Sequence, residues 1–125
     1  MKTLLRVLVT LPAVLFVVTG LRWIIDPEGA ATGLGMTLLE GVGRSSQIGD
    51  VGALFLSMGS MMLLALITAR RSWFYAPALM LSLVAVLRIL AWLVHGAALA
   101  LDMIVVEVLV ASLLIFAASR LSQDD

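Results

Sequence analysis

Cysteine is missing from the 125 residues of this chain, and charged residues make up only 13% of them. Without cysteine there is no disulfide, no thiolate chemistry and no iron–sulfur cluster. Because His95 is the one histidine, a haem held by two histidines is excluded, and a single histidine cannot hold a metal by itself. No phosphate-binding glycine loop, zinc-protease motif or serine-hydrolase motif occurs. We therefore predict no metal site and no catalytic residue, and no cofactor is predicted, with a bound lipid or quinone as the alternative that stays open.

The net charge of the chain is zero and does not indicate a highly charged partner. Eight basic residues balance eight acidic ones, so we expect no nucleic-acid partner. The apolar fraction is 62%, whereas soluble domains usually have about 45–50%. A soluble fold of this size would leave much of that apolar surface in water, because small domains have a large surface for their volume. The composition therefore predicts an integral membrane protein.

Four long apolar runs organise the chain, at residues 4–25, 51–69, 73–94 and 98–118. Each is long enough for an α-helix across a hydrocarbon layer of about 30 Å, and no run alternates as a β-barrel strand would. No small-residue cleavage site follows the first run, so we predict a retained helix with Arg22 and Trp23 at the interface. The short connections predict antiparallel hairpins. The fold class is therefore all-α, a single membrane domain over residues 1–125 built as an up-down four-helix bundle.

The connection between the first two runs, residues 26–50, is much longer than the others. In "GMTLLEGVG", Met36, Leu39 and Val42 would lie on one side of a short helix at the membrane surface. The many glycines equally fit an irregular loop. Both interpretations stay open, and either way a loop of this length commonly holds structure or function.

Basic residues predict how the bundle is oriented. The side with both termini carries five of them, and the other side carries Arg22 and Arg44, offset by four acidic residues. The five are Lys2, Arg6, Arg70, Arg71 and Arg120. Cytoplasmic loops carry the excess of Lys and Arg, so we expect both termini in the cytoplasm and the protein in the inner (cytoplasmic) membrane. Arg70 and Arg71 are placed to contact anionic lipid headgroups. Asp124 and Asp125 are expected to end a solvated tail.

Arg88 and Glu107 are the charges that an apolar bundle should not contain. Arg88 precedes a turn near Ala97 by nine residues and Glu107 follows that turn by ten, so both should lie about 14 Å below the surface. An unpaired arginine at mid-span costs roughly 2.5–3.5 kcal/mol on insertion scales. Equal depth on adjacent helices makes the two side chains natural partners. The pair is either a structural clamp between two helices or part of a ligand site.

Other polar residues could continue this site outward. His95 lies on nearly the same side of its helix as Arg88, and Asp102 begins the next run within its reach. Asp50, Ala53, Ser57 and Ser60 form a stripe of small and polar side chains, which is also typical of close helix packing. The candidate polar interior is thus Arg88, Glu107, Asp50, His95, Arg44, Ser57 and Asp102. His95 alone is equally explained as a histidine satisfied at the interface.

Several of these segments together resemble a known family. They are Gly20, Trp23 and Pro27, then "GRSSQIGDVGALFLSMG", then "LRILAWLVHG", and then Glu107 in the last run. Over nearly the whole chain the pattern resembles small four-helix bacterial membrane proteins of the DoxX-like group, many of them of unknown function. The resemblance implies a helical bundle in the cytoplasmic membrane. Distant relatives are associated with quinone-linked oxidation or with lipid-like ligands, but no residue set here carries over either chemistry.

Three functions remain open at this point. The first is a non-enzymatic accessory or structural subunit of a larger membrane assembly, or a bundle that associates with itself. The second is a binding module that takes a lipid, a quinone or a similar amphiphile into the polar interior. The third is a proton-coupled carrier or membrane enzyme that would exchange protons at Glu107 or His95. The expected partners are membrane lipids and either other subunits or further copies of this chain.

Overall fold

Helices make up most of the chain in the computed structural model, which describes residues 1–123. The expected tail of Asp124 and Asp125 lies outside the described residues. Four helices are long: α1 (Lys2–Ile25), α4 (Gly52–Thr68), α5 (Arg71–His95) and α6 (Leu101–Leu121). Three are short: α2 (Pro27–Gly33), α3 (Gly41–Ser46) and the π-helix η1 (Gln47–Val51). No strand occurs within residues 1–123, so the predicted all-α class is confirmed.

Four helical segments are long and apolar enough to cross a membrane: Lys2–Ile25, Gly41–Thr68, Arg71–His95 and Leu101–Leu121. This indicates a multi-pass membrane protein. The second segment begins ten residues before the expected start at Val51, because α3, η1 and α4 follow one another without a break. A π-turn adds a residue to a helix without ending it. Arg44 and Asp50 therefore lie on the helix rather than on the preceding loop.

The chain divides into two compact units, and the division passes through α1 and α4. Unit 1 combines Met1–Thr10 with the chain from Met61 onward, and unit 2 is Leu11–Ser60. Unit 1 thus holds the first part of α1 and the last part of α4 together with α5 and α6. Leu5 and Val9 of α1 and Met62 and Ala65 of α4 are all buried there.

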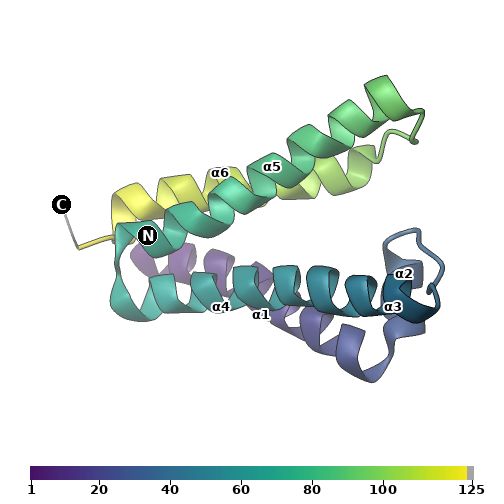
Figure 1. The fold of residues 1–125 in the computed structure, drawn as a ribbon. Helices are drawn as coiled ribbons and strands as arrows, with labels where there is room; N and C mark the ends of the chain where they lie inside the picture. The colour runs from purple at the N-terminus through teal and green to yellow at the C-terminus, as the bar shows by residue number, and fades with distance from the viewer. Residues whose placement is uncertain (124–125) are drawn as a thin grey trace. The chain divides into compact units, whose positions relative to one another are not determined.

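The contact between α5 and α6 follows a regular pattern. Figure 1 shows the two helices side by side. On α5 the buried positions include Phe74, Ala78, Leu81 and Ala85, separated alternately by four and three residues, and Pro77 beside Ala78 is buried as well. On α6 they include Ile104, Glu107, Ala111, Leu114, Ala118 and Leu121, with the same alternation. This spacing keeps one stripe of each helix facing its neighbour, as in a coiled coil. We call the α5 stripe the α5 seam.

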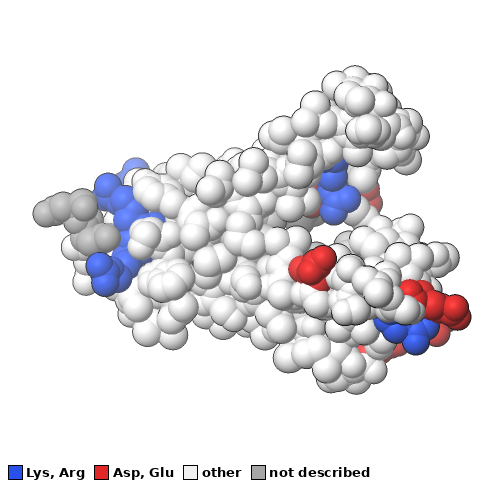
Figure 2. Space-filling view, viewed as in Figure 1, with Lys and Arg blue, Asp and Glu red and all other residues white. Residues whose placement is uncertain are grey.

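Hydrogen bonds tie one end of unit 1 together. Arg6 donates from Nη1 to the Leu66 carbonyl at 3.2 Å, and Arg71 donates from Nε to Ser122 Oγ at 3.3 Å. The Gln123 amide donates to the Ala69 carbonyl at 2.8 Å. Basic side chains gather at this end of the unit (Figure 2). It is formed by the start of α1, the turn from α4 to α5, and the end of α6.

Unit 2 is built on a close contact of α1 with α4. A Cβ atom added at Gly59 would lie 2.7 Å from the Ala13 carbonyl oxygen and 2.8 Å from the Val17 amide nitrogen. Both of these are backbone atoms, so the two helices approach as closely as glycine permits. Phe16 and Phe55 add a tilted ring contact at 5.8 Å between centroids.

The predicted stripe of Ala53, Ser57 and Ser60 does not make this contact, because all three residues are exposed. The close approach uses Gly20 and Gly59 instead. Residues that lack a side chain let the backbones come nearer than serine does. The predicted stripe of small and polar residues is therefore not the surface by which α4 packs on α1.

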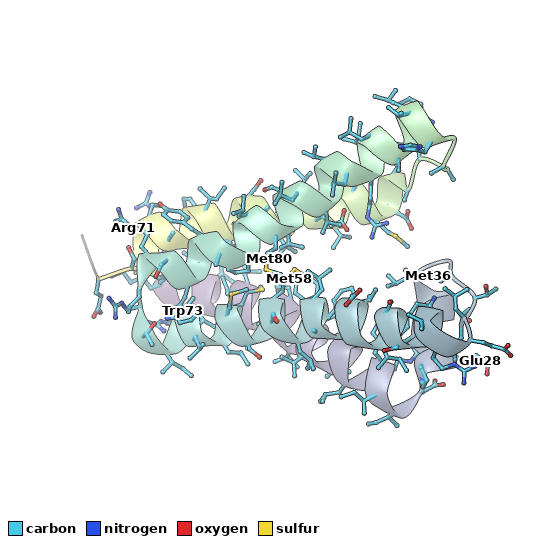
Figure 3. All side chains as sticks on the ribbon, in the orientation of Figure 1. Glu28, Met36, Met58, Arg71, Trp73 and Met80 are labelled. Atoms are coloured by element: carbon cyan, nitrogen blue, oxygen red, sulfur yellow. The ribbon has the colours of Figure 1, made fainter. Side chains whose placement is uncertain are left out.

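The connection from α1 to α3 is compact. Asp26 caps α2 by accepting a hydrogen bond from the Gly29 amide at 3.2 Å, and Pro27 occupies the first helical position, where its missing N–H is not needed. Residues 36–40, where the sequence left a short helix open, have no regular secondary structure. Helices instead flank this stretch on both sides. Met36 lies at the same end of the unit as Glu28 (Figure 3).

Trp23 is fully buried rather than exposed at an interface as expected. It packs against Ala30 and Ala31 of α2, and around them lie the partly buried Leu34, Leu38, Ile48, Val51 and Phe55. The folding back of α2 over the end of α1 covers the indole, which the sequence pattern did not indicate. Arg22 stays exposed and pairs with Asp26 at 3.6 Å.

Candidate functional site

Arg88 of α5 and Glu107 of α6 meet across the contact between these two helices. Arg88 Nε donates to both carboxylate oxygens of Glu107, at 3.1 Å to Oε1 and 2.9 Å to Oε2. Glu107 belongs to the buried stripe of α6, and Arg88 follows Ala85 by three residues along the α5 seam. The packing of the α5 and α6 stripes therefore places Arg88 directly opposite Glu107.

The two charges lie at similar distances from the ends of their helices. Arg88 is seven residues from the end of α5 at His95, and Glu107 is six from the start of α6 at Leu101. These separations correspond to about 10 Å and about 9 Å along the helix axes, so the two charges are nearly equally far from the connection at residues 96–100.

The guanidinium of Arg88 is only partly used. Its terminal Nη1 and Nη2 groups make no hydrogen bond to any residue within 1–123. The Arg88 side chain is 30% exposed, compared with 11% for Glu107. Arginine carries five N–H donors and no acceptor, so four donors remain for a partner outside the ion pair. In a hydrocarbon environment each unpaired donor is unfavourable, because no water is there to accept from it.

The α5 seam continues beyond Arg88 with the same alternation, through Trp92 and His95. Up to Ala85 its residues are buried, whereas Trp92 is 44% exposed and His95 is exposed as well. Beyond Arg88, which pairs with Glu107, unit 1 leaves the α5 seam uncovered at Trp92 and His95. An aromatic ring one turn from the guanidinium gives this stretch both apolar and polar character.

His95 and Asp102 are not joined in the structure. Within the described residues neither side chain makes a hydrogen bond or an ion pair, and both are exposed. Gly96 follows His95 in the left-handed conformation (φ 68°) and ends α5, and Asp102 lies in the first turn of α6. A carboxylate there is favourable because of the helix dipole, which explains Asp102 without a ligand.

The other three candidate residues belong to unit 2. Arg44 donates from Nε to the Leu39 carbonyl at 2.9 Å, so it anchors the loop before α3. Asp50 lies in the π-turn η1 and is exposed, and Ser57 is exposed on α4. Neither Asp50 nor Ser57 makes a side-chain hydrogen bond within residues 1–123. Within residues 1–123 no hydrogen bond or ion pair joins these three side chains to one another.

Gln47 is a structural residue that the sequence reading missed. Its buried carboxamide accepts from the Leu39 amide at 2.8 Å and donates to the Thr37 carbonyl at 3.0 Å. It therefore holds the irregular residues 36–40 against the start of the second span. An uncharged amide in a polar loop gives no signal in a single sequence. The indole N–H of Trp23 is also buried and has no acceptor within the described residues, whereas the sequence predicted this ring at the interface.

Similarity to known proteins adds nothing to this site. No family model, no curated protein and no solved structure matches the chain. The resemblance to the DoxX-like group therefore stays a prediction, and the function has to be argued from the geometry around Arg88.

Proposed function

We propose that this chain is a non-enzymatic multi-pass membrane protein that binds the oxygen-bearing head of an amphiphile, such as a lipid or a quinone, at Arg88. The observation that carries the proposal is the set of unpartnered Nη1 and Nη2 donors in a guanidinium whose Nε is fixed by Glu107. The carboxylate holds the arginine in place, so the free donors are oriented before a ligand arrives. The exposed apolar residues around it would contact the tail.

The test is the retention of native lipids and quinones by protein extracted from membranes, measured by native mass spectrometry and by analysis of the extracted organic fraction. Arg88→Lys keeps a cation for Glu107 but removes the planar donor fork, so retention should fall by about tenfold if one charge-assisted hydrogen bond is lost. Arg22→Ala, which removes an exposed arginine of unit 2, should leave retention unchanged. Equal retention in the wild type, Arg88→Lys and Arg88→Ala would overturn the proposal.

A second function is favoured by the end of the α5 seam, at Trp92 and His95, which unit 1 leaves uncovered. Trp92 continues a stripe that is buried elsewhere on α5, and such a stripe can pack on a helix of another copy or of a larger membrane assembly. In this role the chain is an accessory or structural subunit. Trp92→Ala should then shift the protein to a lower mass in native mass spectrometry. A monomer in both the wild type and the variant would exclude self-association.

The proposal includes an inner-membrane location, an antiparallel order of the four spans and cytoplasmic termini. Support comes from the basic residues at one end of unit 1 and from the contact of Arg71, at the start of α5, with Ser122, after the end of α6. An excess of Lys and Arg is typical of the cytoplasmic side.

A further inference from the structure

We infer that the ligand group bound by Arg88 is an uncharged oxygen acceptor, such as a ketone, quinone, ester or amide carbonyl, and not a carboxylate, phosphate or sulfonate. This inference rests on the proposed function and narrows the class of its ligand. It follows from the charges around the guanidinium rather than from its donors, since both classes of acceptor could take hydrogen bonds from Nη1 and Nη2.

Glu107 already offsets the charge of Arg88. The two side chains form an ion pair at 2.9 Å, and no other basic side chain makes an ion pair with Glu107 within residues 1–123. The pair as a whole is therefore neutral. A neutral acceptor would keep the site neutral, whereas an anion would leave one negative charge uncompensated in hydrocarbon.

The other charged groups of unit 1 act against an anion as well. Asp102, in the first turn of α6, is acidic and lies on the same helix as Glu107, five residues before it. The unit's other Lys and Arg residues belong to its opposite end, at the start of α1, the start of α5 and the end of α6. At the end of unit 1 that contains Arg88, the remaining titratable group is His95, seven residues beyond Arg88 on the α5 seam. Unit 1 therefore places no second permanent cation beside Arg88 to hold an anion.

The geometry of the pair fits a carbonyl in a further respect. Because Nε serves both oxygens of Glu107, the two Nη groups are left as adjacent donors, and one carbonyl oxygen has two lone pairs to accept from them. The exposed Trp92, one turn along α5, offers an apolar face beside this position for a flat or alkyl group.

Two probes of matched shape test the inference: a C16 alkyl methyl sulfone, which is neutral, and a C16 alkyl sulfonate, which is always ionised. Each carries a photoreactive group in its chain, and labelling of the protein in nanodiscs of neutral phospholipid is quantified by mass spectrometry of peptides from α5 and α6. The wild type should be labelled by the sulfone about tenfold more than by the sulfonate, which corresponds to about 1.4 kcal/mol. Arg88→Lys should lower labelling by the sulfone.

Glu107→Gln supplies the sharper comparison, because it removes the offsetting charge and keeps the shape of the side chain. The variant should reverse the preference toward the sulfonate, while Glu28→Gln, an exposed glutamate of α2 in unit 2, should leave the wild-type ratio unchanged. A wild type that prefers the sulfonate would overturn the inference and leave the proposed function standing. Absence of site-specific labelling by either probe would overturn the proposed function itself. The wild-type ratio decides the question even if Glu107→Gln fails to fold.

Discussion

Gln47 and Arg88 show two ways in which polar side chains are accommodated in this apolar chain. The carboxamide of Gln47 is buried, and both its oxygen and its nitrogen are paired with backbone groups of residues 37 and 39. Arg88 is paired through one nitrogen and leaves two others unpaired. A fully paired polar group stabilises local structure, whereas a partly paired one in a membrane indicates a place for a partner.

Gln47→Ala should therefore destabilise the connection before the second span. The substitution leaves the Leu39 amide and the Thr37 carbonyl without partners, a loss of about 1–3 kcal/mol when such groups stay shielded from water. Hydrogen exchange of residues 36–40 in detergent should become faster. Ser46→Ala, at the preceding exposed position, is the control and should leave the exchange rates unchanged. Unchanged exchange in Gln47→Ala would show that the loop does not depend on this amide.

Gly96 is needed for its backbone conformation and not for space. Its φ is +68°, and a Cβ atom added there would meet nothing within 4 Å. Gly96→Ala should thus lower the free energy of unfolding by roughly 1 kcal/mol, the cost of a left-handed residue that carries a side chain. Gly33→Ala is the matched control, since Gly33 has open space and no positive φ. Thermal unfolding in detergent, followed by circular dichroism, compares the two, and equal midpoints would contradict the prediction.

At the scale of elements, glycines set how closely α1 and α4 approach. The sequence indicated a stripe of Ala53, Ser57 and Ser60, and the structure uses Gly20 and Gly59 instead. Gly59 and the stripe residues all lie on α4, so the sequence could not decide which of them meets α1. The choice depends on which side of α4 meets α1, and this is a property of the packed pair.

Gly59→Ala should weaken this contact. The added methyl group would meet the backbone of Ala13 and Val17, which cannot rotate away, so the helices must separate. We expect a loss of about 1–3 kcal/mol, although alanine by itself favours a helix more than glycine does. The control is Ser60→Ala, next along the chain and exposed. Unfolding in a mixed detergent series measures both, and a Gly59→Ala variant as stable as wild type would refute the close approach.

At the scale of the whole molecule, the absence of cysteine makes the predicted orientation directly testable. Val42, which is 82% exposed near the start of the second candidate span, should lie outside the cytoplasm, and Gln123, which follows α6, should lie inside. An impermeant maleimide applied to intact spheroplasts should label Val42→Cys. It should label Gln123→Cys only after the membrane is opened. The cysteine-free wild type is the background control, and the opposite labelling pattern would reverse the proposed orientation.

How much could be predicted differs between the fold and the candidate site. The four spans and the meeting of Arg88 with Glu107 follow from local properties, namely hydrophobic run length and equal distance from a tight turn. The burial of Trp23 and the role of Gln47 could not be predicted. Both depend on how residues 26–46 fold back, and glycine-rich segments leave many backbone conformations open.

The sequence by itself indicated a membrane environment and the all-α class, because both depend on composition and on the length of the apolar runs. It also indicated that Arg88 and Glu107 would meet, because that depends on their distance from the turn along the chain. Only the tertiary structure decided which nitrogen of Arg88 serves Glu107, which donors stay free, and where the α5 seam ceases to be covered. Hydrogen-bond geometry and burial depend on neighbouring residues from other helices, and the segment that contains a residue does not specify those neighbours.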